Sequence, residues 1–170
     1  MPEPATIRDA TEADLPVMID IYNASIPGRI ATGDLEPITV ASRLTWYRQH
    51  SPTSRPIWVV ESDHQIVGWL SFQSFYYGRA AYQATAEISI YIAPTHHRRG
   101  VGRQLLQAAI QRSHEFEIQT LLGFIFAHNQ ASLSLFETLG FQRWGYLPKV
   151  AALDCIERDL VIVGRRIATQ

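Results

Sequence analysis

Two spacings of apolar residues follow one another along this chain, one of period two and one near 3.6. The clearest period-two segment is residues 85–93, TAEISIYIA. Its apolar positions, which share one face of a strand, are Ala86, Ile88, Ile90 and Ile92. Glu87, Ser89 and Tyr91 fall on the opposite face. The pattern therefore predicts a strand with one apolar and one more polar side.

Similar runs predict six further strands, at residues 7–8, 56–62, 65–76, 120–127, 141–147 and 158–167. Helical spacing predicts four helices, near residues 15–22, 40–50, 100–117 and 129–141. Thr11 and Asp14 form a variant of the capping box before the first helix, and Gly140 is placed to end the last one. The order β-α-α-β-β-β-α-β-α-β-β predicts a mixed α/β sandwich in one domain, residues 1–170.

Composition narrows the classes of protein that this fold can serve. The formal net charge is −1, with 46% apolar and 18% charged residues, so no global field recruits nucleic acid or an anionic membrane. Cys155 is the only cysteine, which excludes an intrachain disulfide and a cysteine zinc cluster. The first residues lack a leader pattern, and no apolar run reaches the length of a membrane span. We expect a cytoplasmic protein.

Residues 94–106, PTHHRRGVGRQLL, concentrate histidine, arginine and glycine before an apolar helix. A metal site is disfavoured, because His96 and His97 are sequence neighbours whose side chains diverge and no third ligand lies at the right spacing. A nucleic-acid site is disfavoured too, because three arginines on a nearly neutral chain make a small footprint. We expect neither ligand here.

A phosphate site fits the same segment better. Gly100 and Gly102 lie where a strand gives way to a helix, whose first N–H groups are unpaired and attract anions. A dinucleotide fingerprint would need a third glycine where this chain has Leu105, and a Walker A loop would need a lysine that the segment lacks. An ordinary glycine-rich helix start remains the alternative on this evidence alone.

The segment RRGVGRQLL after the strand AEISIYIAP resembles motif A of the GNAT acetyltransferases, Q/R-x-x-G-x-G/A. His97 departs from the first position of that motif, whereas Gly100 and Gly102 match it. HNQASLSLFETLGF is similar to the next GNAT element, in which an asparagine precedes a helix ending in GF. The stretches IRDATEADLPVMIDIYN, EPIT, GRAAYQATAEISIYI and GFQRWGYLPKV resemble the phosphinothricin/methionine sulfoximine acetyltransferase branch.

The resemblance implies a central, mostly antiparallel sheet with a splayed strand pair, flanked by helices, and acetyl-CoA as co-substrate. Main-chain groups on the motif strand would face the pantetheine arm, and the loop amides would wrap the pyrophosphate. The residues implied in acetyl-CoA binding are Ile90, Tyr91, Ile92, Arg98, Arg99, Gly100, Val101, Gly102, Arg103, Asn129 and Ser132.

Glu87 is the candidate catalytic residue. An alkylamine must lose a proton before it attacks a thioester, and the matching position of the family implies a base or an ammonium-binding group. A solvated strand carboxylate is the alternative. The family's usual acid for the leaving thiolate is a tyrosine, but Phe136 stands there, so Tyr146, His128, water or no acid at all remain open. Cys155 as a nucleophile is a weaker hypothesis, since no histidine is local to it.

The acceptor side is implied by YYGRAAYQATAE. Arg79 matches a substrate-site arginine of the branch, and a guanidinium suits a carboxylate or phosphinate. Tyr77 and Tyr82 would wall the same pocket together with Glu87. Arg29 and Glu36 are weaker acceptor-side candidates, while Asp159 is expected to be structural.

The expected function is therefore N-acetylation of a small amino-acid-like amine by direct transfer from acetyl-CoA. Two alternatives stay open: a peptide N-terminus or polyamine as acceptor, and an acetyl-CoA-binding sensor without catalysis. The resemblance also implies a homodimer.

Overall fold

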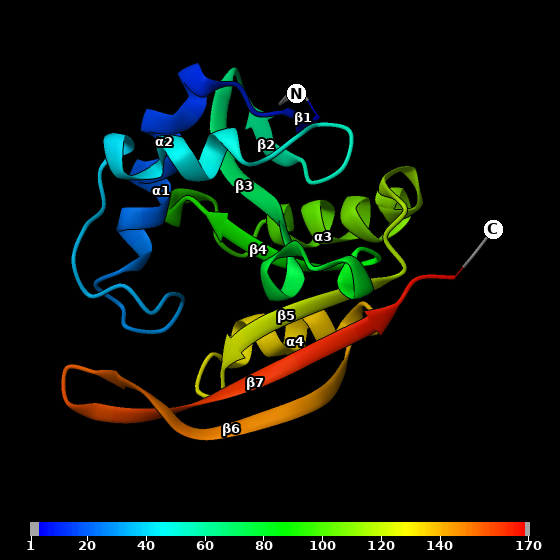
Figure 1. Cartoon of the computed structure of the whole chain (residues 1–170). Coiled ribbons are helices and arrows are strands. Elements are labelled where there is room, and N and C mark those ends of the chain that lie inside the picture. The colour runs from blue at the N-terminus through cyan, green and yellow to red at the C-terminus, as the bar shows by residue number, and fades with distance from the viewer. Residues whose placement is uncertain (1–3, 169–170) are drawn as a thin grey trace.

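The computed structural model describes residues 4–168 and has the element order expected from the sequence (Figure 1). The strands are β1 (Thr6–Asp9), β2 (Ile57–Ser62), β3 (Gln65–Ser74), β4 (Thr85–Ile92), β5 (Thr120–Phe126), β6 (Gln142–Leu153) and β7 (Ile156–Arg166). The helices are α1 (Leu15–Ser25), α2 (Val40–Arg48), α3 (Val101–Arg112) and α4 (Gln130–Thr138). Short 3₁₀ turns join several of these elements.

The seven strands form one sheet in the order β1-β2-β3-β4-β5-β7-β6. Every neighbouring pair is antiparallel except β4 and β5, which run parallel. These two strands pair only through three residue pairs, the last of them Glu87 with Leu122, and then separate. The expectation of a mostly antiparallel sheet with a splayed strand pair is confirmed, and Figure 1 shows the two halves diverging from this point.

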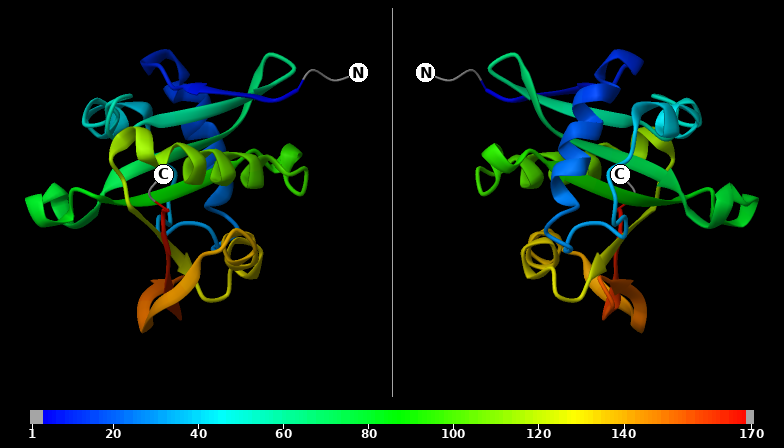
Figure 2. Two further views of the ribbon diagram at one scale, coloured as in Figure 1. Left: turned by 90° about the vertical axis from the view of Figure 1, so that its right-hand side faces the viewer. Right: turned by 90° about the vertical axis from the view of Figure 1, so that its left-hand side faces the viewer.

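The hydrophobic core consists of two clusters, one on each face of the sheet, and helices cover both. The α3 residues Leu105, Leu106 and Ala109 are fully buried, in a cluster with the alternate side chains Ala86 and Ile88 of β4. Helix α1 buries its apolar side in a second cluster, where it meets residues of β2 and β3. The apolar side chains at helical spacing in α1 and α3 and at alternate positions in β4 thus face the core, as predicted. Figure 2 shows the layers from two opposite sides.

The elements differ from the sequence-based ranges mainly at their ends. Helix α3 stops at Arg112 rather than near residue 117, because the Ser113 hydroxyl donates to the Ala109 carbonyl at 2.6 Å and a 3₁₀ turn follows. Strand β3 stops at Ser74, because Tyr76 and Tyr77 adopt positive φ angles of 50° and 62°.

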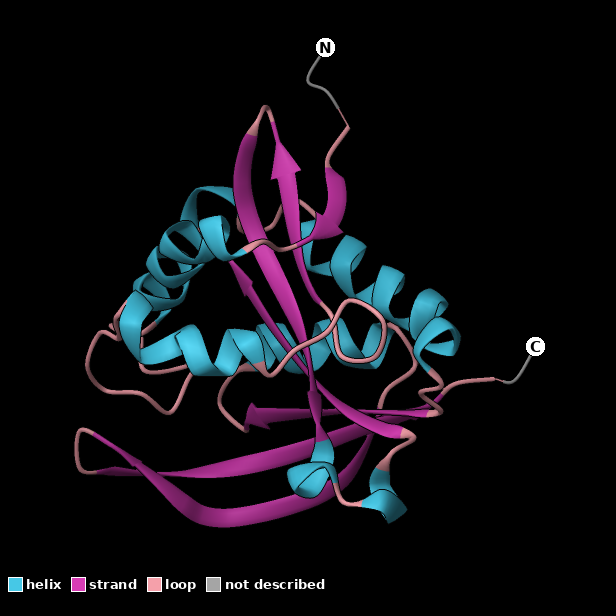
Figure 3. Ribbon diagram, turned by 45° about the horizontal axis from the view of Figure 1, so that its top comes forward, coloured by secondary structure: helices cyan, strands magenta, loops and turns pink. Residues whose placement is uncertain are grey.

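The last two strands are longer than predicted and form an extended hairpin (Figure 3). Their turn is Asp154 and Cys155, with φ angles of 52° and 65°. Two successive left-handed residues are the backbone of a type I′ turn, which suits the twist of a two-residue hairpin. The turn lacks the usual Asn-Gly or Asp-Gly signature, and for that reason the sequence pattern does not predict it.

Candidate active site

Strand β4 offers an unpaired edge beyond the point where it leaves β5. The N–H of Ala93 donates to the Val67 carbonyl at 2.8 Å, which places the main-chain groups of the odd-numbered residues of β4 toward β3. The N–H and C=O groups of Ile90 and Ile92 therefore point away from β3, toward the gap. No described strand pairs with this edge beyond Glu87.

The glycine loop lies at the end of the same strand. Arg98 and Gly100 have φ angles of 60° and 80°, and α3 begins at Val101. The first hydrogen bond of the helix runs from the Gln104 N–H to the Gly100 carbonyl at 3.0 Å, so the N–H groups ahead of it have no acceptor within the helix. Arg98, Arg99 and Arg103 are exposed around these amides.

Gly102 joins this loop to the gap. A Cβ built on it would lie 3.3 Å from Leu135 Cδ2 on α4 and 3.9 Å from Ile92 Cγ1 on β4. The helix start, the free edge of β4 and helix α4 therefore meet at one point. Main-chain donors in an opening that a side chain would fill are what a pyrophosphate and its extended arm require.

His97 is turned back onto β4. Its Nε2 donates to the Ile92 carbonyl at 2.9 Å, so one main-chain acceptor of the gap is taken by this side chain. The residue that departs from the family motif thus closes the end of the free edge.

Asn129 and Ser132 meet at the start of α4. The buried Asn129 side chain accepts a hydrogen bond from the Ser132 N–H at 3.2 Å and donates to the Ile30 carbonyl at 3.3 Å. Asn129 is therefore the cap of α4 and an anchor for the loop 26–39. Its predicted contact with the co-substrate stays a prediction.

Asn129→Ala is expected to destabilise the fold by about 1–2 kcal/mol, because it removes a helix cap and leaves the Ile30 carbonyl without its side-chain donor. Urea unfolding monitored by circular dichroism gives the change. An unchanged unfolding midpoint would contradict the capping role, and a raised KM for acetyl-CoA would add the predicted contact to it.

Glu87 is half-buried on the polar face of β4, directly opposite Gln73 of β3. No described residue makes an ion pair or hydrogen bond with its carboxylate. Burial raises the pKa of the Glu87 carboxyl above its ordinary value. A carboxylate that is desolvated and unpaired is a stronger base than a solvated one. The polar orientation predicted from the strand alternation is observed.

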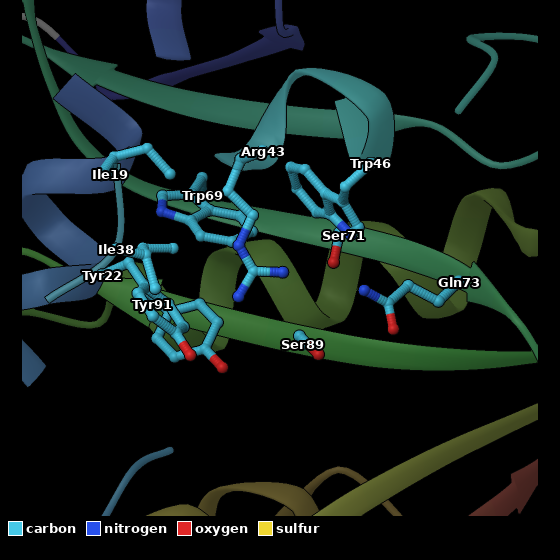
Figure 4. A pocket seen from close by; sticks show the side chains of 10 residues that line it. All are labelled: Ile19, Tyr22, Ile38, Arg43, Trp46, Trp69, Ser71, Gln73, Ser89 and Tyr91. Atoms are coloured by element: carbon cyan, nitrogen blue, oxygen red, sulfur yellow. The ribbon is translucent and has the colours of Figure 1, made fainter. Parts of the chain in front are cut away.

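A cavity of about 190 Å³ lies on the same face of β3 and β4, beneath α1 and α2 (Figure 4). Its aromatic wall consists of Tyr22, Trp46, Trp69 and Tyr91. Its polar lining consists of Arg43, Ser71, Gln73 and Ser89. The rungs of the strand pair run from Trp69–Tyr91 through Ser71–Ser89 to Gln73–Glu87, so Glu87 stands next to the cavity along the sheet.

Sequence reasoning missed most of this cavity. Arg43 comes from the short helix α2, whose weak apolar periodicity gives no sign of which residues face the sheet. Ser71 and Gln73 interrupt the apolar run of β3 at alternate positions, on the face that Glu87 also uses. Polar residues at i and i+2 in a buried strand were the available signal.

Tyr77, Arg79 and Tyr82, which were predicted to contact the acceptor, do not line the cavity. Tyr77 is 96% exposed, and the Arg79 guanidinium lies 5.8 Å from the centre of the Tyr76 ring. Tyr82 packs edge-on against Phe75 with ring centres 5.5 Å apart. Within this chain they lie apart from the cavity, and their substrate contacts stay predictions.

The loop 26–39 borders the cavity and is fastened at several points. The hydroxyl of Tyr22, which lines the cavity, bonds the Thr32 hydroxyl at 2.5 Å and donates to the Asp34 carboxylate. Arg29 pairs with Asp154 of the β6–β7 turn at 2.7 Å, and His128 donates to the Arg29 carbonyl. Arg29 is thus an anchor, and Glu36 is exposed on the same loop.

Other predicted residues have plain structural surroundings. Asp159 accepts hydrogen bonds from the Tyr146 hydroxyl and from the Lys149 N–H, which braces the β6–β7 hairpin as expected. Phe136 is buried against Phe141.

In the part of the chain that the structure describes, no three His, Cys, Asp or Glu side chains gather as metal ligands. None of the described helices is both long and apolar enough to cross a membrane.

Comparison with known proteins agrees with this geometry. A family model described as "Acetyltransferase (GNAT) family" matches residues 18–141. YwnH of Bacillus subtilis (strain 168), provisionally named a phosphinothricin acetyltransferase, is 43% identical over 164 residues, 96% of this chain and 99% of its own. The L-methionine sulfoximine/L-methionine sulfone acetyltransferase of Pseudomonas aeruginosa is 31% identical over 147 residues, 86% of this chain and 85% of its own. The structure of yncA from Salmonella typhimurium with its cofactor acetyl-CoA superposes with a TM-score of 0.90 at 26% identity, covering 99% of this chain and 96% of that one.

Proposed function

This chain belongs to the acetyltransferase (GNAT) family and is an acetyl-CoA-dependent N-acetyltransferase, and we propose that residues 1–170 act as one domain that acetylates the amine of a small amino-acid-like acceptor. The acceptors that we propose are of the phosphinothricin and methionine sulfoximine type, which the names of its relatives specify. The unpaired carboxylate of Glu87 beside an aromatic cavity carries this proposal.

Glu87 is proposed as the general base. An alkylammonium holds its proton at neutral pH, so a group in the site must accept it before the nitrogen can attack. The Glu87 carboxylate, with no competing partner among the described residues, accepts it directly or through water. Rate acceleration beyond this step comes from holding the amine and the thioester together, because no covalent intermediate on the protein is needed.

The β4 edge and the glycine loop are proposed as the acetyl-CoA site. Acetyl-CoA supplies the activated acetyl group. The main-chain groups of Ile90 and the N–H of Ile92, with Tyr91 between them, orient the arm of the co-substrate, and the amides of residues 98–103 bind its pyrophosphate. Asn129 and Ser132 complete the site from α4. Since Phe136 has no proton to donate, we assign no acid to the leaving thiolate.

The cavity favours an amino-acid-like acceptor over a polyamine. A polyamine needs several carboxylates, and none of the ten residues that line the cavity is acidic. A volume of about 190 Å³ also suits a compact molecule better than a peptide.

Release of the thiol of CoA, followed colorimetrically, tests the proposal. Purified protein is supplied with acetyl-CoA and, in separate reactions, phosphinothricin, L-methionine sulfoximine, spermidine and an alanine-initiated peptide. We expect turnover with the first two and at most one tenth of that rate with the others. Tight acetyl-CoA binding without turnover of any amine would favour the sensor instead.

The protein is further proposed to be a homodimer. The β6–β7 hairpin exposes the large apolar side chains Trp144, Tyr146, Leu147, Val150 and Ile156. A surface hairpin that exposes several large apolar side chains is a candidate for protein contact. We also propose a cytoplasmic location, with which the single free Cys155 is consistent.

A further inference from the structure

The acceptor cavity contains one charged side chain in its lining, the guanidinium of Arg43 (Figure 4). We propose that Arg43 binds the α-carboxylate of the acceptor and so makes the enzyme selective for α-amino acids over amines without that group. This inference rests on the proposed function and names the residue that recognises the carboxylate of the acceptor.

Arg43 is held in place with part of its donor fork unused. Its Nη2 lies 3.3 Å from the Asp34 carboxylate, and its guanidinium carbon lies 5.6 Å from the centre of the Tyr22 ring. Nε and Nη1 donate to no described residue. An anchored guanidinium loses little side-chain entropy when it binds a further carboxylate, and its planar fork matches that group.

Two further donors of the cavity are buried without partners. The hydroxyl of Ser71, a residue with 0% exposure, and the indole N–H of Trp46 have no hydrogen-bond partner among the described residues. Buried polar groups without partners are costly, so such groups usually face a ligand or water. Both residues line the same cavity as Arg43. The ten residues that line the cavity thus include these donors and no carboxylate, which fits an anionic group.

The position of Glu87 gives the acceptor a direction. Ser71 and Ser89 form the rung next to Gln73 and Glu87, and successive same-face rungs lie about 7 Å apart along a strand. An α-amino acid spans this distance with one hydrogen bond of about 3 Å at each end. In the proposed pose its ammonium lies at the Glu87 carboxylate and its own carboxylate at the Ser71–Ser89 rung, toward which the Arg43 guanidinium extends from α2 (Figure 4). A carboxylate-free amine meets only the first of these charges.

The test compares L-methionine sulfoximine with its α-carboxamide in the wild type, Arg43→Gln and Arg43→Lys. We expect Arg43→Gln to lower kcat/KM for the carboxylate substrate about 10- to 100-fold, the usual effect of losing a hydrogen bond between charged groups. The same variant should change kcat/KM for the carboxamide by less than about threefold, because that acceptor brings no charge to Arg43. Arg43→Lys should recover part of the loss.

Two controls separate binding from a structural role. Arg48→Gln removes an exposed arginine of the same helix, outside the cavity lining, and should leave both acceptors unaffected. Asp34→Asn removes the anchor of Arg43. If Arg43 only holds the loop 26–39, Asp34→Asn and Arg43→Gln will lower the rates with both acceptors equally, which would overturn the inference.

The outcomes also distinguish the inference from the proposed function. A wild type that acetylates neither compound contradicts the function itself. A wild type that acetylates both, with a preference that Arg43→Gln leaves unchanged, contradicts only the role of Arg43. Calorimetric titration with CoA should give the same affinity for the wild type and Arg43→Gln, so that any loss is assigned to the acceptor side.

Discussion

Replacing Glu87 by glutamine is expected to lower kcat/KM for the acceptor amine by about 10²–10⁴-fold, the usual contribution of a general base. Glutamine keeps the size of the side chain and its place opposite Gln73 but cannot accept the proton of the ammonium. The rate of CoA release under subsaturating acceptor measures the effect. Glu157→Gln, an exposed carboxylate on the β6–β7 hairpin, is the matched control and should turn over like the wild type.

The same variant should not be less stable. Burial raises the pKa of Glu87 in the folded state above its value in the unfolded chain. A raised pKa contributes stability that is fully present below the unfolded pKa and lost as the pH rises through the folded one. Glutamine stays neutral and escapes this loss, so Glu87→Gln should unfold at the same or a slightly higher urea concentration near neutral pH. An inactive variant that is also unfolded would contradict this account.

Gly102→Val is expected to raise the KM for acetyl-CoA by about two orders of magnitude. Its Cβ would lie between Leu135 and Ile92, at the junction of the glycine loop with the free edge of β4. The branched side chain would occupy the opening and keep the pyrophosphate from the amides of the helix start, where bonds to a charged group contribute about 1.5–3 kcal/mol each. Calorimetric titration with CoA measures the loss directly.

A glycine that faces ordinary surroundings is the control for this variant. A Cβ on Gly28 would meet its neighbours at 3.7 and 3.9 Å, so Gly28→Ala should bind CoA as the wild type does. Gly100→Ala separates space from backbone, because its Cβ would meet nothing within 4 Å but its φ of +80° is strained for alanine. Unchanged CoA affinity in a folded Gly102→Val protein would place the co-substrate elsewhere.

Much of the fold could be predicted because local patterns and tertiary packing agree. The alternation of residues 85–93 assigned Ala86 and Ile88 to the core and Glu87 to a polar face, and the register with β3 has that arrangement. The glycine pair predicted a strand-to-helix turn, which Gly100 makes with a positive φ. Such features depend on a few neighbouring residues, so the sequence alone carries them.

The cavity proposed to hold the acceptor could not be predicted in the same way, because its walls come from distant parts of the chain. Arg43 and Trp46 reach it from α2, while Ser71 belongs to β3 and Tyr91 to β4. The weak periodicity of α2 does not show that Arg43 reaches the sheet, and the polar pair Ser71 and Gln73 in β3 marks one wall without showing that the others converge on it. Arg79 drew attention through its resemblance to the family, yet in this chain it packs on the Tyr76 ring outside the cavity.

The central claim is that the half-buried carboxylate of Glu87 deprotonates the acceptor amine. The pH dependence of kcat/KM for L-methionine sulfoximine, measured for the wild type and Glu87→Gln, tests it most directly. The wild-type profile should fall on the acid side with a midpoint above the ordinary glutamate value of about 4.3, because burial raises the pKa of Glu87. The residual activity of Glu87→Gln should lack this acid limb. A variant that keeps both the limb and the wild-type rate would contradict the claim.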